Sequence, residues 1–386
     1  MPKLIFILIG LLLALPLPAQ QSVLNGPLIA VDKAAGDGLI LYDVAAQTTR
    51  ELNFGGAGQR VWDFSPDGCR VLLTMHDSLG NDRLYSARID GTDLQELVTD
   101  VDVPPENWSA WNPQWSPDGS RIAFTLVTDT LEGREYHIAW VPPEGGVPEL
   151  YSASGDEHEP VWSADGRWLA YIAYDERAAG ADIYSTAEPT AVPPPGQTGA
   201  EIPLLREADL WVVSADAASK YRLTYFDTGS IRSPRWSPDT NLIGFTYSPS
   251  AANDQFWMIA NQPGSIPTQL SYEWSLILDT TWLADSSAMI ASVRDMQQTA
   301  DNRLWRIPLV GSADTDAVPF LRVPELGYAD YPRFSPDGRW LALRSAYALA
   351  LVDQTDNSWQ IIDTLPLANT PPVWSPAGFS SEADCL

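Results

Sequence analysis

Few residues of this chain have the type and spacing that a reaction centre requires. The 386 residues include only three histidines, His76, His137 and His158, and none of the intervals between them fits a metal-binding motif. The sequence also lacks the Gly-x-Ser-x-Gly elbow of serine hydrolases and any glycine-rich phosphate loop. We therefore predict that the chain is not an enzyme, and we assign it no cofactor and no metal ligands. Acidic loops such as Asp100-Val101-Asp102 and Asp314-Thr315-Asp316 offer oxygen ligands, so calcium binding stays open.

One acidic position recurs along the chain and needs its own explanation. It belongs to an aromatic-Ser-Pro-Asp-Gly motif, complete or degenerate, whose seven aromatic residues are Phe64, Trp115, Trp162, Trp236, Trp282, Phe334 and Trp374. Six copies keep the aspartate, as catalysis or calcium binding would require. However, Pro sets the first corner of a tight turn, Asp accepts hydrogen bonds from the turn backbone, and Gly adopts a positive φ. We therefore assign the repeated aspartates to turns and not to chemistry.

The motif spacing indicates the architecture that carries these turns. Successive aromatic residues are 51, 47, 74, 46, 52 and 40 residues apart, and all but one of these steps fit a four-stranded propeller blade. Alternating apolar runs such as 121–126 and 168–172 follow the turns, as expected for buried strands. We predict an all-β, seven-bladed β-propeller. A six-bladed ring is the alternative if the weakest copy, at Trp282, belongs to a neighbouring sheet.

The two ends of the chain supply complementary parts of one blade. Residues 27–31, 39–43 and 48–52 give three strands with no motif before them, and Trp374 gives a motif strand with almost nothing after it. We therefore predict a composite closing blade, which leaves the ring without free edges. The long 74-residue step contains a Pro-, Gly- and Ala-rich insertion at about 178–208, which we interpret either as a lid or as a linker.

The repeats resemble those of TolB-type β-propellers, and similar repeats occur in the propeller domains of prolyl oligopeptidase-like enzymes. The resemblance covers nearly the whole chain after its N-terminal segment. It implies a propeller fold. It does not imply a role in a particular envelope system. TolB-type proteins combine a six-bladed propeller with an additional N-terminal domain, whereas this sequence has seven motif copies and its strands begin within about ten residues of the predicted signal.

Composition and the N-terminus limit the location and the partners. Residues 1–20 have the features of a secretory signal, in which Lys3 precedes an apolar run from Leu4 to Leu17, so residues 21–386 form the predicted propeller domain. A net charge of −27 disfavours binding to nucleic acid and to anionic membranes. We expect a secreted or periplasmic protein without stable membrane insertion after the signal is cleaved.

The candidate binding residues open the motif strands, near the mouth of the central channel. Four positions before each aromatic residue the sequence varies from copy to copy, as a recognition surface would. The candidates are Arg60, Trp111, His158, Arg232 and Asp330. We predict a non-catalytic protein-interaction or scaffolding module whose partner is a protein or an envelope polymer. The alternative is a carbohydrate- or peptide-binding sensor that uses the channel mouth.

The only two cysteines, Cys69 and Cys385, are the remaining residues whose side chains could react with each other. Cys69 follows the turn glycine of the first complete blade, and Cys385 lies seven residues beyond Gly378, the equivalent position of the closing blade. A seven-residue tail spans at most about 25 Å, which reaches an adjacent blade. We predict a disulfide between them in an oxidising compartment, the alternative being two unpaired thiols.

Overall fold

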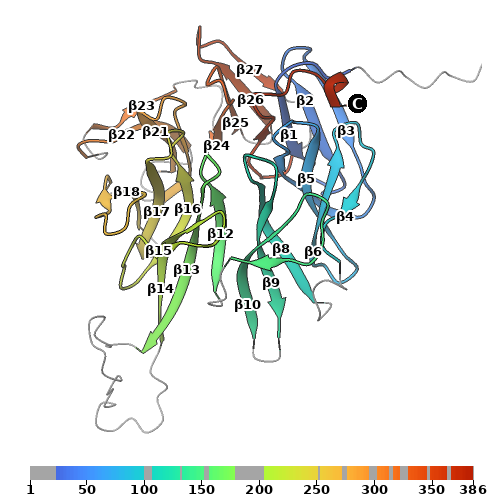
Figure 1. Cartoon of the computed structure of the whole chain (residues 1–386). Coiled ribbons are helices and arrows are strands. Elements are labelled where there is room, and N and C mark those ends of the chain that lie inside the picture. Colours follow the sequence, from blue (N-terminus) through green and yellow to red (C-terminus); the bar gives the residue numbers. More distant parts are fainter. Residues whose placement is uncertain are drawn as a thin grey trace, which may run out of the picture.

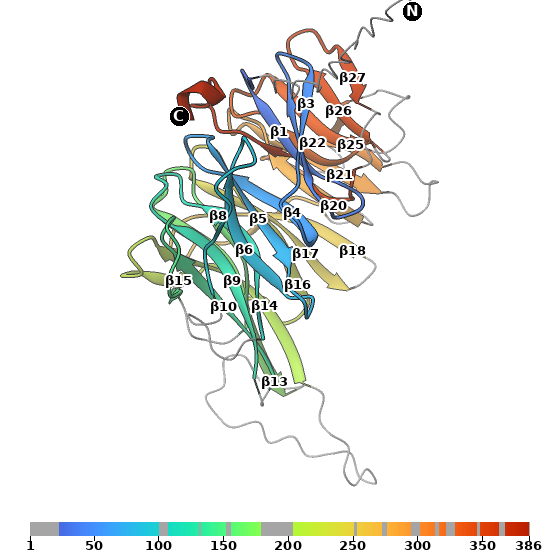
Figure 2. The ribbon, with the colours of Figure 1, turned by 90° about the vertical axis from the view of Figure 1, so that its right-hand side faces the viewer.

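The structure is a computed structural model that describes residues 23–99, 107–130, 133–151, 156–178, 204–250, 253–271, 276–294, 302–312, 316–321, 329–345, 348–362 and 367–385. Within these ranges the chain forms seven four-stranded antiparallel sheets arranged in a ring, as the blades of a β-propeller (Figures 1 and 2). The predicted signal at 1–20 lies outside the described residues, and so do residues 179–203 of the predicted insertion.

Each motif copy contributes the innermost strand of one sheet, and the prediction of seven blades is confirmed. Blades 1 to 3 contain β4 (Ala57–Phe64), β5 (Arg70–His76), β6 (Asp82–Arg88) and β7 (Gln95–Glu96), then β8 (Trp108–Trp115), β9 (Ile122–Asp129), β10 (Arg134–Val141) and β11 (Glu149–Leu150), then β12 (Glu157–Trp162), β13 (Trp168–Ala178), β14 (Leu204–Ser214) and β15 (Lys220–Arg222).

The remaining blades follow the same order. Blades 4 to 6 contain β16 (Ser230–Trp236), β17 (Leu242–Ser250), β18 (Asn253–Ala260) and β19 (Thr268–Gln269), then β20 (Leu276–Trp282), β21 (Ala288–Arg294), β22 (Asn302–Pro308) and β23 (Val318–Pro319), then β24 (Asp330–Phe334), β25 (Trp340–Ser345), β26 (Ala348–Asp353) and β27 (Trp359–Ile362). The Trp282 copy, which the six-bladed alternative assigned to a neighbouring sheet, has its own complete blade.

Blade 7 is the composite blade that the chain ends predict. Its strands are β28 (Val373–Trp374), β1 (Leu28–Asp32), β2 (Leu39–Asp43) and β3 (Thr48–Leu52). The C-terminal strand β28 pairs antiparallel with β1, with Ile29 opposite Trp374. The Ser375 hydroxyl accepts a hydrogen bond from the Leu28 amide at 2.9 Å. This pairing closes the ring.

The repeated aspartates stabilise turns, as the motif chemistry predicts. In blade 2, an Asp118 carboxylate oxygen accepts hydrogen bonds from the Ser116 hydroxyl at 2.6 Å and from the Ser120 amide at 3.0 Å. The Ser116 hydroxyl in turn accepts the Arg121 amide at 3.0 Å. Gly119 has a φ of 74°, in the left-handed region that favours glycine. These turns define one face of the ring, which we call the turn face, and the opposite face is the mouth face.

The hairpin of β13 and β14 in blade 3 is longer than the sequence predicts. The long strands β13 and β14 pair from Trp168 opposite Ser214 to Ala178 opposite Leu204. The pairing therefore enters the range that the sequence assigns to an irregular insertion, because backbone pairing can continue beyond the apolar alternation. The hairpin ends that the structure describes, Ala178 and Leu204, lie on the mouth face, at the opposite end of β13 from the motif turn (Figure 1).

The C-terminal tail reaches the first turn of blade 1 at the turn face. Cys69 and Cys385 are joined by a disulfide in the structure, with their Cα atoms 5.3 Å apart. The short 3-10 helix η2 (Glu382–Cys385) carries the second cysteine beside blade 7 (Figure 2). Among the described residues, no helix is long and apolar enough to cross a membrane.

Candidate functional site

The five candidate residues lie at equivalent register positions around the channel mouth. In blades 2, 3, 4 and 6 the candidate is the last residue of the innermost strand to pair before the register shifts, whereas in blade 1 Val61 still pairs with Leu73 after Arg60. The partners across the ladder are Thr74 for Arg60, Thr125 for Trp111, Ile172 for His158, Thr246 for Arg232 and Arg344 for Asp330. The repeat therefore places them on one ring, although they come from five different blades.

A β-bulge explains why the strands are interrupted just after these residues. In four blades the next residue has a positive φ between 52° and 53°, and these residues are Asn112, Glu159, Ser233 and Tyr331. A proline follows each of them, at a position where the ladder is already broken. Such a bulge bends the strand directly after the candidate residue.

Two of the candidates belong to one row of aromatic rings on blades 2 and 3. The Tyr136 ring lies 5.7 Å from the Trp111 ring and 4.4 Å from the His158 ring, measured between centroids. The His158 ring meets Tyr174 edge-on at 5.4 Å. All four side chains are partly exposed. The row is thus an apolar surface that extends across two blades.

The row continues into blade 1 through a charged group. Asp82 interacts with His76, Arg60 and the Trp111 side chain. These three contacts lower the pKa of Asp82, but burial outweighs them and raises it above its usual value. The Arg60 guanidinium lies over the Trp62 ring, 3.7 Å from its centroid. We call the surface formed by Arg60, Trp62, Asp82, Trp111, Tyr136, His158 and Tyr174 the mouth band. Tyr136, Tyr174, Trp62 and Asp82 are not among the sequence candidates, because they occupy strands and positions that the motif does not mark.

The other two candidates are held in separate contacts. The Arg232 guanidinium donates to Asp254 at 2.6 Å and to the Ile277 carbonyl at 2.7 Å, so it ties blade 4 to blade 5. Asp330 lies near Arg344 in blade 6, and burial lowers the pKa of that guanidinium. The structure therefore joins Arg60, Trp111 and His158 in one surface and leaves Arg232 and Asp330 outside it.

The histidines do not form a metal site within the described residues. His76, His137 and His158 lie on β5, β10 and β12, and no group of three or more His, Cys, Asp or Glu in the described ranges is arranged to hold an ion. Burial lowers the pKa of His158 below its usual value, although Glu159 and Glu157 oppose that shift. The His158 Nε2 atom lies 2.5 Å from an Asp156 carboxylate oxygen, so His158 contributes an aromatic, hydrogen-bonding surface.

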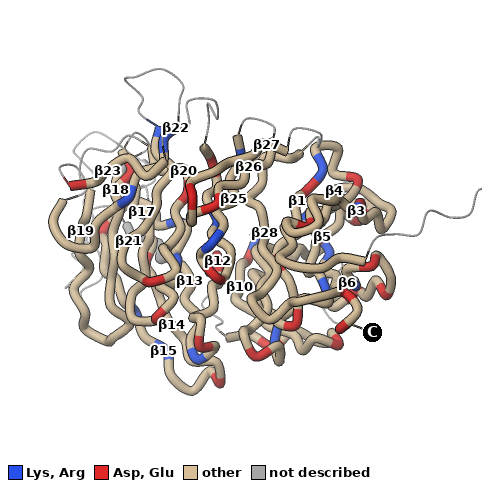
Figure 3. The backbone as a smooth tube through the Cα atoms, turned by 90° about the horizontal axis from the view of Figure 1, so that it is seen from above, with Lys and Arg blue, Asp and Glu red and all other residues tan. Residues whose placement is uncertain are grey.

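Charged residues also connect neighbouring blades. Asp279 of blade 5 lies between Arg333 of blade 6, at 2.6 Å, and Arg235 of blade 4, at 3.3 Å. Glu159 of blade 3 accepts the Ser233 amide of blade 4 at 2.8 Å. Acidic and basic positions adjoin each other near the middle of the ring (Figure 3). These contacts join neighbouring blades, so we assign them to the closure of the ring.

Asp63, which joins blade 1 to blade 2, should make stability depend on pH. Its carboxylate accepts the Trp115 amide at 2.9 Å and the Phe64 amide at 2.8 Å, but burial raises its pKa from 3.8 to about 7. Between those values the folded state holds a proton that the unfolded state releases, so raising the pH destabilises the fold. Asp63→Asn removes this titration. As the pH rises from 4 to 8, we therefore expect the free energy of unfolding of the unmodified protein to fall by about 2–4 kcal/mol relative to that of the variant. Denaturant unfolding of both proteins across this range measures the difference, and parallel pH profiles would contradict it.

The comparisons with other sequences are limited in extent. No family model matches the chain. An uncharacterized protein of Agrobacterium fabrum is 28% identical over 140 residues, covering 34% of this chain and 45% of that protein. The uncharacterized peptidase YuxL of Bacillus subtilis is 26% identical over 159 residues, covering 40% of this chain and 20% of that protein. The chain thus spans less than half the length of these relatives.

Solved structures match over most of the chain. An oligogalacturonate lyase in complex with manganese has a TM-score of 0.55 and 12% identity, over 83% of this chain and 87% of its own. A puromycin-hydrolyzing peptidase of Mycobacterium tuberculosis has a TM-score of 0.55 and 14% identity, over 89% and 54%. TolB from Acinetobacter baumannii has a TM-score of 0.47 and 15% identity, over 91% and 83%. Such identities show the fold alone, and the lyase and the puromycin-hydrolyzing peptidase, with TM-scores of 0.55, support a β-propeller.

These comparisons overturn the prediction that the chain is not an enzyme. That prediction rested on the absence of a nucleophile elbow and of clustered histidines. Proteins of similar fold include a lyase and a peptidase, and one sequence relative is named a peptidase. A propeller can assemble a site from loops of several blades, and such a site leaves no contiguous motif in the sequence.

Proposed function

We propose that the mouth band binds an extended segment of a partner protein or peptide. The observation that carries this proposal is the continuity of the band, which extends from Arg60 of blade 1 to Tyr174 of blade 3 on one face of the ring. Partly exposed aromatic rings next to an arginine are the side chains that contribute most binding energy at protein interfaces. Half-buried rings also lose little freedom when a partner covers them.

Charge indicates the chemistry of the partner segment. The chain carries a net charge of −27, and Asp82 and the Asp156 carboxylate beside His158 add acceptors along the band. A segment that presents lysine or arginine between apolar residues complements this surface and is attracted to it from a distance. The disulfide supports an extracytoplasmic location for the encounter, because such bonds persist in oxidising compartments.

Selection of random displayed peptides against the purified protein tests the proposal. We expect enrichment of basic peptides that contain aromatic or aliphatic residues, and a loss of affinity of about tenfold or more for Trp111→Ala and Tyr136→Ala. Trp359→Ala is the matched control, because Trp359 is 39% exposed on β27, the outer strand of blade 6. This control should bind the selected peptides with unchanged affinity.

Two results would oppose this function. One is the absence of any enriched peptide, and the other is equal binding by the Trp111→Ala variant and the unmodified protein. Selection of glycans instead of peptides by the same surface would indicate the carbohydrate-sensor alternative. Mass spectrometry of the selected peptides after incubation with the protein shows whether binding is accompanied by turnover.

A further inference from the structure

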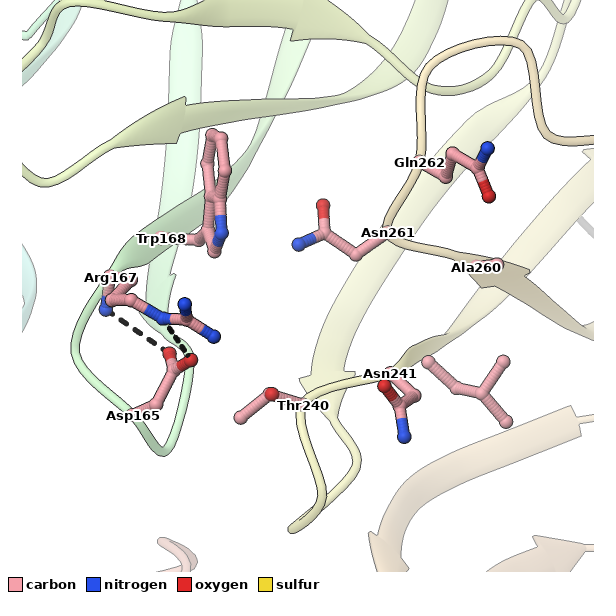
Figure 4. Close-up of a pocket in the computed structure, with 9 residues that line it drawn as sticks. Asp165, Arg167, Trp168, Thr240, Asn241, Ala260, Asn261 and Gln262 are labelled. Carbon is pink, nitrogen blue, oxygen red and sulfur yellow. Dashed lines mark hydrogen bonds and ion pairs between the residues drawn. The ribbon is translucent and has the colours of Figure 1, made fainter.

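A pocket of about 410 Å³ lies on the turn face, opposite the mouth band (Figure 4). It opens between blades 3 and 4. Blade 3 contributes Arg167 and Trp168, which end the turn and begin β13, and blade 4 contributes Thr240 and Asn241 from its turn and Asn261 after β18. Its size suits a small ligand of one or two rings.

Internal hydrogen bonds fix the orientation of both asparagine amides. The Tyr221 hydroxyl donates to the Asn261 carbonyl oxygen at 2.6 Å, so the Asn261 amide nitrogen is directed into the pocket (Figure 4). The Asn241 amide nitrogen donates to Asp239 at 2.8 Å, which leaves its carbonyl oxygen toward the pocket. The pocket therefore presents a fixed donor and a fixed acceptor on the same side.

The opposite side combines an indole and a guanidinium. Trp168 packs edge-on against Tyr221, with the ring centroids 5.6 Å apart, and Figure 4 shows one face of its ring turned across the pocket toward Asn261. Arg167 donates through Nε to Asp165 at 2.6 Å, and its terminal nitrogens point into the pocket. The arginine and the aspartate compensate each other, so this side has donors but no net charge.

Thr240 departs from the repeat at the pocket edge. It occupies the position of the turn glycine and has a φ of 63°, close to the 69° of Gly166 and the 74° of Gly119. A β-branched residue in this region is strained, and such strain is concentrated at functional positions. The substitution places a hydroxyl beside the pocket.

We propose that this pocket binds a neutral saccharide of one or two pyranose rings. The apolar face of a pyranose stacks on an indole, and its hydroxyls both donate and accept hydrogen bonds, as the Asn261 nitrogen, the Asn241 oxygen and the Thr240 hydroxyl require. The balanced Asp165–Arg167 pair favours a neutral sugar over an acidic one. This site does not depend on peptide binding at the mouth band, because it lies on the other face.

Calorimetric titration with cellobiose, maltose, N,N′-diacetylchitobiose and glucuronic acid tests the proposal. We expect millimolar binding of at least one of the three neutral sugars. Trp168→Ala should weaken this binding about tenfold or more, and Arg167→Ala about threefold or more. Arg167 is the safer variant for folding, because its side chain is 76% exposed.

Blade 6 provides the matched control. The sequence Asp-Gly-Arg-Trp at 165–168 of blade 3 recurs at 337–340 of blade 6. There the arginine is held by Asp353 at 3.0 Å. Trp340→Ala should leave sugar affinity unchanged. Absence of binding by all three neutral sugars, stronger binding of glucuronic acid, or equal losses in Trp168→Ala and Trp340→Ala would each overturn the proposal. Peptide affinity at the mouth band, measured on the same variants, should not change.

Discussion

Replacement of Cys69 and Cys385 together by serine is expected to lower the free energy of unfolding by about 5 kcal/mol. The bond joins residues that are 316 positions apart. A cross-link over so long a loop removes much of the conformational freedom of the unfolded chain, and the stabilisation grows with the logarithm of loop length.

The disulfide acts together with other contacts of the C-terminal tail. Glu382 forms an ion pair with Arg50 of blade 7 and accepts the Leu24 amide at 3.1 Å. Arg88 of blade 1 donates to the Cys385 carbonyl at 2.6 Å, and Phe379 is buried in the core between the two blades. The tail thus bridges blades 7 and 1, and loss of the disulfide removes its covalent attachment.

Chemical denaturation of the oxidised protein, the reduced protein and the double serine variant measures the effect. The reduced and variant proteins should have similar, lowered midpoints. Ser380→Ala, which changes an exposed hydroxyl in the same tail, should change stability by less than about 0.5 kcal/mol. Two free thiols in the denatured, unreduced protein would contradict the bond, and so would unchanged midpoints after reduction.

Asp279→Ala is expected to cost about 3–5 kcal/mol of stability. Burial raises the pKa of this carboxyl, but Arg333 and Arg235 more than compensate and hold it below its usual value, so Asp279 is charged in the folded protein. Its side chain is only 4% exposed. Removal of the carboxylate leaves two neighbouring guanidiniums facing each other with no anion between them, at the contact of blades 4, 5 and 6.

Asp37→Ala is the control for this prediction, because Asp37 is 52% exposed and pairs with Lys33 at 3.4 Å. That variant should lose less than about 1 kcal/mol. In a double-mutant cycle, Asp279→Ala should cost less when Arg333 is already replaced by methionine. Equal losses in Asp279→Ala and Asp37→Ala would show that the buried ion pairs do not hold the ring together.

Local patterns in the sequence were sufficient to predict the ring. Each Ser-Pro-Asp-Gly turn uses contacts within about five residues, such as those of Asp118 to Ser116 and Ser120, so each motif specifies its turn without knowledge of the rest of the fold. The apolar runs after the turns then specify the buried strands. The composite blade followed because the strand counts at the two ends are complementary.

The sites were harder to predict because they combine residues of different blades. Arg235, Asp279 and Arg333 come from three repeats, and no short-range pattern pairs them. The bulges were missed because their positive-φ residues include Glu159 and Tyr331, types that give no turn signal. Trp111 and His158 were predicted because both lie four positions before a motif aromatic residue. Tyr136, whose ring contacts both, was missed because it lies on the third strand of blade 2, away from the motif.

The pairing of β28 with β1 has a consequence for the order in which the protein assembles during synthesis. Blades 1 to 6 each consist of one continuous stretch of chain, so each can form soon after it leaves the ribosome. The edge of β1 stays unpaired until Val373 and Trp374, the residues that pair with it, have been synthesised. Until then the nascent chain exposes an unpaired strand edge, which is a template for association with other chains. The synthesis of Val373 and Trp374 therefore determines when this strand edge is covered and no longer available for aggregation.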